Sequence, residues 1–317
     1  MKMNKDDKIL VAGATGMVGS AIVRHLKAKG YTNILTPDRK RVNYTDQHNT
    51  HFYMDCVRPD YVFLAAARVG GIMDNATHAA DYIRDNLRIQ TNLIDSSYKV
   101  GTKKLLFLGS SCIYPKKVKQ PIKENSLLSS SLEKTNEGYA LSKIVTLKYC
   151  QYLKKKYKKN FISIQPANLY GLGDNFNLKS CHVLPALVKK FILAKKNNIN
   201  SVEVWGTGNV KREFLNVEDL AEAIYFLVKK KVNYDFINVG GGEDFSIKQL
   251  AIMIKKIVKY NGKIIFNSKY PDGVKVRKID SSIMRKLGWQ PKIKLKKGLI
   301  KYCEYYSNEI MPYENSS

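Results

Sequence analysis

A glycine-rich turn between a short apolar run and a helical pattern is the strongest constraint on the fold. Residues 9–12 (ILVA) are continuously apolar, and Gly13, Gly16 and Gly19 follow before an amphipathic stretch begins. A strand that enters a helix through such a turn presents backbone N–H groups with no Cβ in the way, and the helix N-terminus adds the positive end of a dipole. The context therefore indicates a pyrophosphate-binding βα unit.

The first half of the chain repeats this alternation of apolar runs and helical patterns. Strands are expected at 9–12, 34–35, 61–67, 105–109 and 161–166, and helices at 17–29, 80–98 and 139–157. Continuous apolar strands separated by helices form parallel sheets that are covered on both faces. The fold class is therefore predicted to be α/β, with a Rossmann-type, doubly wound parallel sheet.

The second half is less regular and predicts a smaller α/β lobe interleaved with the first. Helices are expected at 183–194, 217–229 and 247–260, and strands at 236–239 and 263–266. The pair 217–229 and 236–239 resembles one more unit returning to the main sheet. We therefore assign residues 1–175 plus about 213–242 to the dinucleotide-binding domain, and about 176–212 plus 243–317 to a substrate lobe.

The charge balance is strongly basic, with 54 Lys+Arg against 27 Asp+Glu and a formal net charge of +27. Such a field attracts anions, including nucleic acid and phosphorylated small molecules. The lysines are spread along the whole chain, so we expect a solvated surface and do not expect nucleic acid as a partner. Five cysteines, no visible signal peptide and no apolar run of membrane-spanning length predict a cytoplasmic protein without a membrane partner.

The segment after the second strand, residues 37–41 (PDRKR), bears on which dinucleotide is bound. A carboxylate at this place favours NAD through the ribose hydroxyls, whereas basic side chains favour the 2′-phosphate of NADP. Three cations outweigh one acid. NADP(H) is therefore the expected cofactor, with Arg39 as the candidate contact and Asp38 as the residue that argues the other way.

Tyr139 and Lys143 form a YxxxK pattern at the start of a predicted helix, where a spacing of four places both side chains on one face. An ammonium near a phenol lowers its pKa, so that the tyrosine can move a proton while a nicotinamide moves a hydride. The same pattern occurs at Tyr152 and at Tyr225. Only Tyr139 has a candidate partner for holding a carbonyl oxygen, namely Ser110, which follows the strand 105–109 at its carboxyl end.

Residues 106–115 (LFLGSSCIYP) resemble the signature of the GDP-L-fucose synthases, a family of extended short-chain dehydrogenases. Supporting stretches, in chain order, are 64–71 (LAAARVGG), 135–143 (TNEGYALSK), 168–171 (NLYG), 174–176 (DNF), 182–187 (HVLPAL), 205–206 (WG), 212–215 (REFL) and 271–273 (PDG). The resemblance extends over nearly the whole chain.

This resemblance implies two reactions at one site. GDP-4-keto-6-deoxy-D-mannose is epimerised at carbons 3 and 5, and NADPH then reduces the ketone to give GDP-L-fucose. Cys112 matches the family's base and His182 its acid. Ser110 and Tyr139 hold the ketone oxygen, and Tyr139 donates the proton during reduction, with Lys143 tuning it.

The resemblance also implies binding residues. Those expected at the cofactor are Gly13, Thr15, Gly16, Met17, Val18, Gly19, Arg39, Ala66, Tyr139, Lys143, Asn168 and His182. Those expected at the GDP-sugar are Lys190, Trp205, Arg212 and Lys278; at Lys190 family members often carry arginine. No metal is expected. The resemblance also implies a homodimer, formed through the helices 80–98 and 139–157.

Other functions stay open at this point. A 4,6-dehydratase needs an acid pair where this chain has Ser111, Cys112 and Ile113, and a UDP-hexose 4-epimerase needs no Cys/His pair. A GDP-mannose 3,5-epimerase is a closer alternative because it also performs acid/base chemistry on two carbons. A non-catalytic Rossmann protein that binds nucleic acid would have no use for Ser110, Tyr139 and Lys143 together.

Overall fold

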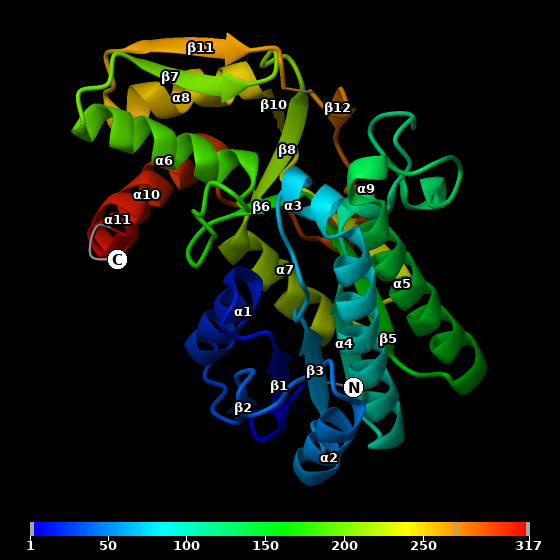
Figure 1. The fold of residues 1–317 in the computed structure, drawn as a ribbon. Coiled ribbons are helices and arrows are strands. Elements are labelled where there is room, and N and C mark those ends of the chain that lie inside the picture. Colours follow the sequence, from blue (N-terminus) through cyan, green and yellow to red (C-terminus); the bar gives the residue numbers. More distant parts are fainter. Residues whose placement is uncertain (1–2, 271, 315–317) are drawn as a thin grey trace.

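The computed structural model describes residues 3–270 and 272–314 and arranges them in two lobes (Figure 1). The larger lobe is built on one parallel sheet of six strands in the order β2-β1-β3-β4-β5-β9. These strands are β1 (Ile9–Ala12), β2 (Ile34–Leu35), β3 (Tyr61–Leu64), β4 (Lys104–Leu108), β5 (Phe161–Pro166) and β9 (Phe236–Val239). The predicted Rossmann-type sheet is confirmed, and β9 returns to it as expected by pairing with β5.

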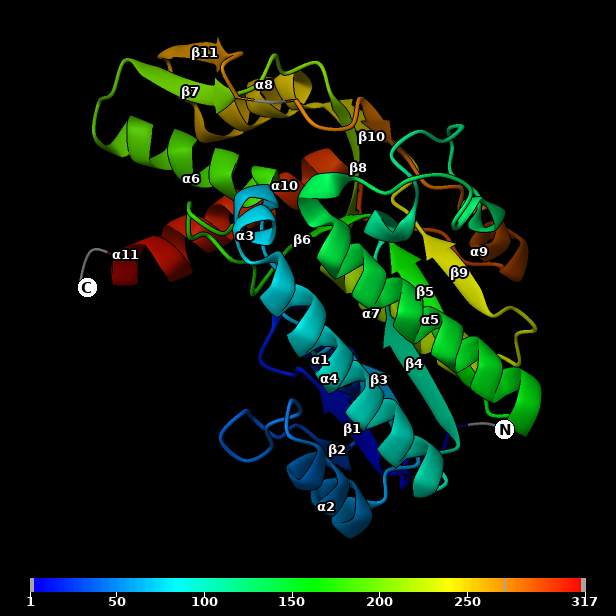
Figure 2. The same ribbon diagram turned by 45° about the vertical axis from the view of Figure 1, so that its right-hand side comes forward.

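Helices cover both faces of this sheet, as Figure 2 shows. On one face α1 packs against α7, and on the other α4 packs against both α2 and α5. Their bounds are α1 (Met17–Ala28), α2 (Gln47–Val57), α4 (Ala79–Lys99), α5 (Glu137–Tyr157) and α7 (Val217–Lys229). Burial on both faces explains why β1 and β3 are apolar at every position rather than at alternate ones.

The order of the strands determines where a ligand can enter. The chain passes from β1 to β2 on one side and then returns to β3 on the other, so β1 is paired with both. At such a reversal the connections leave in opposite directions and open a crevice at the carboxyl ends of the strands. The turn at Gly13 and the segment after Leu64 therefore face the same crevice.

The smaller lobe surrounds β8 (Lys211–Asn216), which pairs with β10 (Asp244–Ser246) in antiparallel fashion and with β12 (Val276–Arg277) and β6 (Asn168–Tyr170) in parallel. A separate parallel pair joins β7 (Ser201–Trp205) to β11 (Lys263–Asn267). The lobe's helices are α6 (Val183–Lys196), α8 (Ile247–Val258) and α10 (Leu295–Tyr305), and α10 continues into a π-helical turn (Tyr306–Ile310) and α11 (Met311–Glu314).

The remaining helical segments are short connectors. They are α3 (Ile72–Thr77), α9 (Ser282–Leu287) and the 3-10 turns Ser111–Ile113, Glu124–Ser126 and Lys134–Asn136. Within residues 3–270 and 272–314, no helix combines the length and the apolar character needed to cross a bilayer.

Each lobe has a hydrophobic core of its own. That of the smaller lobe includes Phe176 and Tyr302, whose ring centroids lie 5.3 Å apart. Ile279, Met284 and Trp289 pack in the core of the larger lobe, although they fall in the segment 243–317 assigned above to the other lobe. The residue boundaries of the domains stay a prediction, but the chain returns to the larger lobe at α9 and crosses back to the smaller lobe at α10.

Met284 tests this packing. Its side chain is 0% exposed, whereas that of Met73 on α3 is 59% exposed. We expect Met284→Ala to lower the free energy of unfolding by about 2–5 kcal/mol, because it leaves a cavity in the larger core. Met73→Ala, the matched control, should change it by less than ~0.5 kcal/mol. Denaturant titration measures both, and equal effects of the two substitutions would contradict the placement of α9.

Candidate active site

The turn after β1 is shaped by contacts that only glycine permits. Gly13 has φ +85°, and a Cβ there would lie 2.7 Å from the backbone nitrogen of Ala66. A Cβ on Gly19 would lie 2.0 Å from the carbonyl oxygen of Gly13. A Cβ on Gly16 would meet nothing closer than 3.5 Å. Two of the glycines therefore close the turn, and the third keeps the space in front of the helix open.

This space lies at an N-terminus that the protein leaves available. Gly16 is the N-cap of α1 and offers no side-chain cap, and the first turn of α1 carries no acidic residue. The positive end of the helix dipole therefore has no counter-charge from its own first turn. The cradle fits the pyrophosphate of a dinucleotide.

The end of β2 presents cations rather than a free carboxylate. Asp38 Oδ1 accepts a hydrogen bond from the backbone N–H of Arg41 (2.9 Å), so the carboxylate supports its own turn. Arg39 and Lys40 are exposed beside it. This arrangement suits a 2′-phosphate better than a pair of ribose hydroxyls. The doubt raised by Asp38 in the sequence is thus resolved by what its side chain does.

Tyr139 and Lys143 lie one turn apart at the start of α5. Gly138 allows this helix end to approach α4 closely, since a Cβ there would lie 2.7 Å from the Ala79 carbonyl oxygen. Lys143 is only 2% exposed; its Nζ donates to the carbonyl of Leu108 (2.8 Å) and lies 5.6 Å from the centroid of the Tyr139 ring. Burial lowers the pKa of Lys143 to about 7.

Ser110 lies beside Tyr139. Burial raises the pKa of the Tyr139 phenol, and the neighbouring Ser110 hydroxyl acts to lower it. The Ser110 backbone N–H donates to Gln165 Oε1 (2.8 Å), and Gln165 Nε2 donates to Ser163 Oγ (2.7 Å). Gln165 on β5 thus positions Ser110. A glutamine inside a strand carries no sequence signal of such a role.

Cys112 is carried by the 3-10 turn that follows β4. Its backbone N–H donates to Ser110 Oγ (3.1 Å), and its side chain is half-buried. A negative charge on the thiol would raise the pKa of three groups around it. They are the phenol of Tyr139, the ammonium of Lys143 and the guanidinium of Arg212. The structure therefore brings Cys112 into the same cluster as the tyrosine and the lysine.

His182 is the N-cap residue of α6, and its side chain is exposed. Protein atoms packed around it nevertheless displace water and lower the pKa of its imidazole. The preceding residues are tied to the larger lobe, because the Gly71 N–H donates to the Ser180 carbonyl (2.7 Å). The pairing of His182 with Cys112 across a substrate stays a prediction.

The cations expected at the GDP-sugar differ in what they contact. Arg212 Nη1 donates to the Val274 carbonyl (2.7 Å), and burial lowers its pKa to about 10. Lys278 Nζ is paired with Asp244 Oδ1 (3.1 Å). Its neighbour Arg277 was not among the expected residues, yet it reaches the backbone of the Cys112 turn. The roles of Arg212 and Lys278 in binding stay predictions.

Lys190 and Trp205 lie together in the smaller lobe. Lys190 Nζ donates to the Glu203 carbonyl (3.0 Å) and lies 5.2 Å from the Trp205 ring centroid. Trp205 is 48% exposed and stacks on Tyr270, with centroids 4.3 Å apart. Asp272 accepts from both the N–H and the hydroxyl of Thr207 (2.7 Å each). Pro271 of the predicted PDG turn lies outside the described residues.

Two further expected cofactor residues flank the crevice. Ala66 follows β3 and contacts the Gly13 turn as described, and Asn168 on β6 donates through Nδ2 to the Glu213 carbonyl (3.0 Å). Thr15, Met17 and Val18 belong to the glycine turn and the start of α1. Their contacts with a dinucleotide stay predictions.

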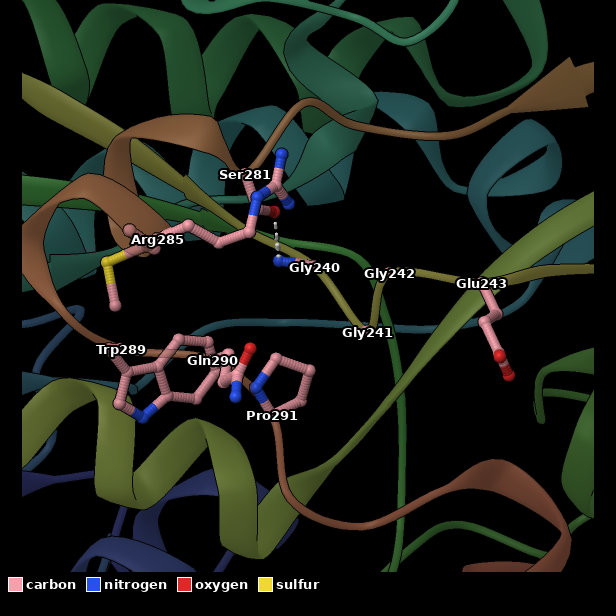
Figure 3. Close-up of a pocket in the computed structure, with 10 residues that line it drawn as sticks. Gly240, Gly241, Gly242, Glu243, Ser281, Arg285, Trp289, Gln290 and Pro291 are labelled. Carbon is pink, nitrogen blue, oxygen red and sulfur yellow. Dashed lines mark hydrogen bonds between the residues drawn. The ribbon is translucent and has the colours of Figure 1, made fainter.

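A separate hollow lies at the end of β9, where the Ser281 hydroxyl accepts the Gly240 N–H (2.8 Å) (Figure 3). Trp289 and Arg285 also line it, and none of the candidate catalytic residues does. Across residues 3–270 and 272–314 there is no group of three or more His, Cys, Asp or Glu side chains that could hold a metal ion.

Residues 9–240 match the model of the NAD dependent epimerase/dehydratase family. The chain belongs to this family. It is 46% identical to GDP-L-fucose synthase 1 of Arabidopsis thaliana, over 97% of this chain and 95% of that protein. It is 40% identical to the GDP-L-fucose synthase of Escherichia coli K12, over 94% of this chain and 96% of that protein.

A solved structure of this epimerase/dehydratase fold carries the same architecture. The GDP-mannoheptose C4 reductase from Campylobacter jejuni with NADP bound has 36% sequence identity and a TM-score of 0.88, covering 96% of this chain and 100% of that one. The resemblance to GDP-L-fucose synthases noted in the sequence is thereby confirmed.

The glycine turn yields a paired test. Gly16→Ala should fold normally, because its φ of −82° and its surroundings accept a Cβ. It should weaken dinucleotide binding by ~10-fold or more, about 1.4 kcal/mol, since the methyl group occupies the phosphate space. Gly19→Ala should instead lower stability by more than ~1 kcal/mol through overpacking. Calorimetric titration with NADPH and thermal unfolding separate the two effects; unchanged binding by Gly16→Ala would contradict the cradle.

Proposed function

We propose that this protein converts GDP-4-keto-6-deoxy-D-mannose to GDP-L-fucose by epimerisation at carbons 3 and 5 followed by NADPH-dependent reduction of the 4-ketone. The observation that carries the proposal is the convergence of two catalytic sets at the end of β4. Ser110, Tyr139 and Lys143 suit a ketone reductase, and Cys112 beside them suits proton abstraction. Full-length identity of 46% and 40% to two GDP-L-fucose synthases supports it.

The cofactor is NADP(H), which supplies the hydride. The open space at Gly16, the uncapped start of α1 and the exposed Arg39 suit its phosphates, and Asp38 is engaged with its own turn. NADP is bound to the related heptose reductase of C. jejuni, which has the same fold.

Epimerisation uses the acidity of the carbons beside the ketone. The Cys112 thiolate removes a proton from one of them, and the C–H electron pair moves into an enolate whose oxygen receives hydrogen bonds from Ser110 and Tyr139. His182 delivers a proton to the opposite face and inverts the carbon. Solvent then returns Cys112 and His182 to their starting protonation states, and the sequence repeats at the second carbon.

Reduction uses the same oxygen holders. As carbon 4 accepts hydride, its oxygen takes the Tyr139 proton, and the nearby ammonium of Lys143 stabilises the phenolate left behind. The Leu108 carbonyl fixes the Lys143 ammonium from the side of the sheet. One arrangement of Ser110 and Tyr139 thus supports an enolate in the first stage and an alkoxide in the second.

The decisive experiment separates the two stages. Purified protein is supplied with GDP-4-keto-6-deoxy-D-mannose, NADPH oxidation is followed by absorbance, and the product is resolved chromatographically. Tyr139→Phe should slow NADPH oxidation by ~10²–10⁴-fold. Cys112→Ser should abolish incorporation of solvent deuterium into the sugar. Tyr225→Phe, in the third YxxxK match on α7, is the control and should behave as wild type. NADPH oxidation without GDP-L-fucose as product would overturn the proposal.

Arg39 is proposed to select the phosphorylated cofactor. Arg39→Ala should reduce the efficiency with NADPH by roughly 10-fold or more, because a charge-assisted contact to the 2′-phosphate is lost. Efficiency with NADH should hardly change, since NADH has no such phosphate. Steady-state kinetics with both cofactors give the ratio, and an unchanged ratio would assign cofactor choice to other residues.

We propose a homodimer through α4 and α5. Leu141, Val145 and Tyr152 are exposed along one face of α5, and a second copy would cover them. Sedimentation velocity should give twice the 36.1 kDa chain mass, and Val145→Glu should shift the protein to monomer while leaving its unfolding unchanged. A wild-type sedimentation coefficient of a single chain would refute the dimer.

A further inference from the structure

We infer that Arg277 is the positioning residue for the epimerisation base, and that it acts by holding the backbone turn that carries Cys112. The inference rests on the proposed function, because it concerns the role of Cys112. It adds a residue that sequence reasoning missed and a reason why the smaller lobe is needed for proton abstraction.

The contact is direct and spans both ends of the turn. Arg277 Nη1 donates to the Ser111 carbonyl (2.8 Å) and to the Tyr114 carbonyl (3.3 Å). Ser111 begins the 3-10 turn and Tyr114 is its C-cap, so Cys112 lies between the two bonded carbonyls. The turn's own backbone hydrogen bonds are long, at 3.3 Å from Ile113 to Ser110 and from Tyr114 to Ser111, and the Cys112 N–H donates to the Ser110 hydroxyl (3.1 Å).

Arg277 can act as a clamp on the Cys112 turn because the backbone on both sides of Arg277 is itself held in place. Arg277 pairs in register with Arg212 on β8, and two residues later Ile279 forms a parallel bridge with Ile122. The Ile122 N–H also donates to the Lys278 carbonyl (2.8 Å). Arg277 therefore stands at the point where the β8 sheet of the smaller lobe joins the larger lobe.

Placing Arg277 next to Arg212 costs free energy, because two positive charges lie close together. Arg277 lies beside Arg212. The pKa of the Arg212 guanidinium is lowered chiefly by its burial and, second, by the positive charge of Arg277. Two neighbouring cations repel, so the pair needs compensating acceptors. The two turn carbonyls supply them for Arg277, and the Val274 and Lys211 carbonyls supply them for Arg212. Asp272 already supplies one negative charge near Arg212, and a thiolate at Cys112 would add a second.

The two reaction stages depend on this clamp to different extents. Reduction needs Ser110, Tyr139 and Lys143, which Gln165 and the Leu108 carbonyl hold from within the main sheet. Proton abstraction needs the Cys112 sulfur, which depends on the turn. Displacement of a reacting group by ~1 Å can cost about 10²-fold in rate. Loss of Arg277 should therefore slow epimerisation far more than hydride transfer.

The test measures the stages separately in the full-length protein. Epimerisation is followed as deuterium incorporation from D₂O into GDP-4-keto-6-deoxy-D-mannose with NADP⁺ present, so that no reduction occurs. Hydride transfer is followed as initial oxidation of GDP-L-fucose by NADP⁺, which requires no change at carbons 3 and 5. Arg277→Gln removes the charge, and Arg277→Lys keeps the charge but loses the planar fork. Arg285→Gln, an exposed arginine on α9, is the matched control.

We expect Arg277→Gln to lower the exchange rate by ~10–100-fold with hydride transfer reduced by less than ~3-fold. Arg277→Lys should recover part of the exchange, and Arg285→Gln should match wild type. The alkylation rate of Cys112 by iodoacetamide should show a changed pH profile in Arg277→Gln, a readout that a general loss of stability would not move. If Arg277→Gln does not fold, the same comparisons are made with Arg277→Lys.

Either of two results would overturn the inference. One is exchange and alkylation equal to wild type in both variants, and the other is a loss of exchange and hydride transfer in the same proportion. Cys112→Ser keeps these outcomes apart from failure of the proposed function. If Cys112→Ser exchanges deuterium normally, the base assignment itself is wrong; if it does not exchange while Arg277→Gln does so at the wild-type rate, only the role of Arg277 is rejected.

Discussion

A backbone contact at the carboxyl end of β1 is the constraint on which the site depends. Gly13 lies so close to Ala66 and to Gly19 that a Cβ on either glycine would overlap backbone atoms. This contact fixes the start of α1 against the end of β3 at the place where the strand order reverses. The ends of β4 and β5, with Ser110 and Gln165, then follow from the parallel register of the sheet. The candidate catalytic serine is thus placed by main-chain geometry.

Buried cations distinguish this crevice from an ordinary Rossmann edge. Lys143 and Arg212 both have lowered pKa values because burial disfavours their charged forms, and backbone carbonyls rather than carboxylates receive their protons. A carboxylate partner would neutralise the site before any ligand arrived. Carbonyl partners hold the cations in place and leave the field positive. Such a field favours the species the proposed chemistry produces, namely an enolate, a phenolate and a thiolate, as well as the phosphates of both substrates.

The sequence predicts the larger lobe well because its signals are local. Strands buried on both faces are continuously apolar, and β1, β5, α7 and β9 agree with the ranges expected from the pattern. The strand expected at 61–67 ends at Leu64, since the next residues leave the sheet to meet the Gly13 turn. The strands of the smaller lobe are harder to predict from the sequence. β6, β10 and β12 are two or three residues long, too short for any period to show, and β8 carries charged residues at its start.

The residues of the candidate site likewise divide into those that local sequence patterns reveal and those that they do not. Ser110, Cys112, Tyr139 and Lys143 lie in short motifs on one strand end and one helix start, so spacing and resemblance are enough to find them. Gln165 and Arg277 act through contacts with residues 55 and 166 positions away, which no local pattern encodes. Lys278 was the natural choice from the sequence because it is charged and follows the turn at Asp272. Its side chain is paired with Asp244, whereas that of Arg277 reaches the larger lobe. Neighbouring residues of an extended segment point to opposite sides, and which side faces the site depends on the register of β12 with β8.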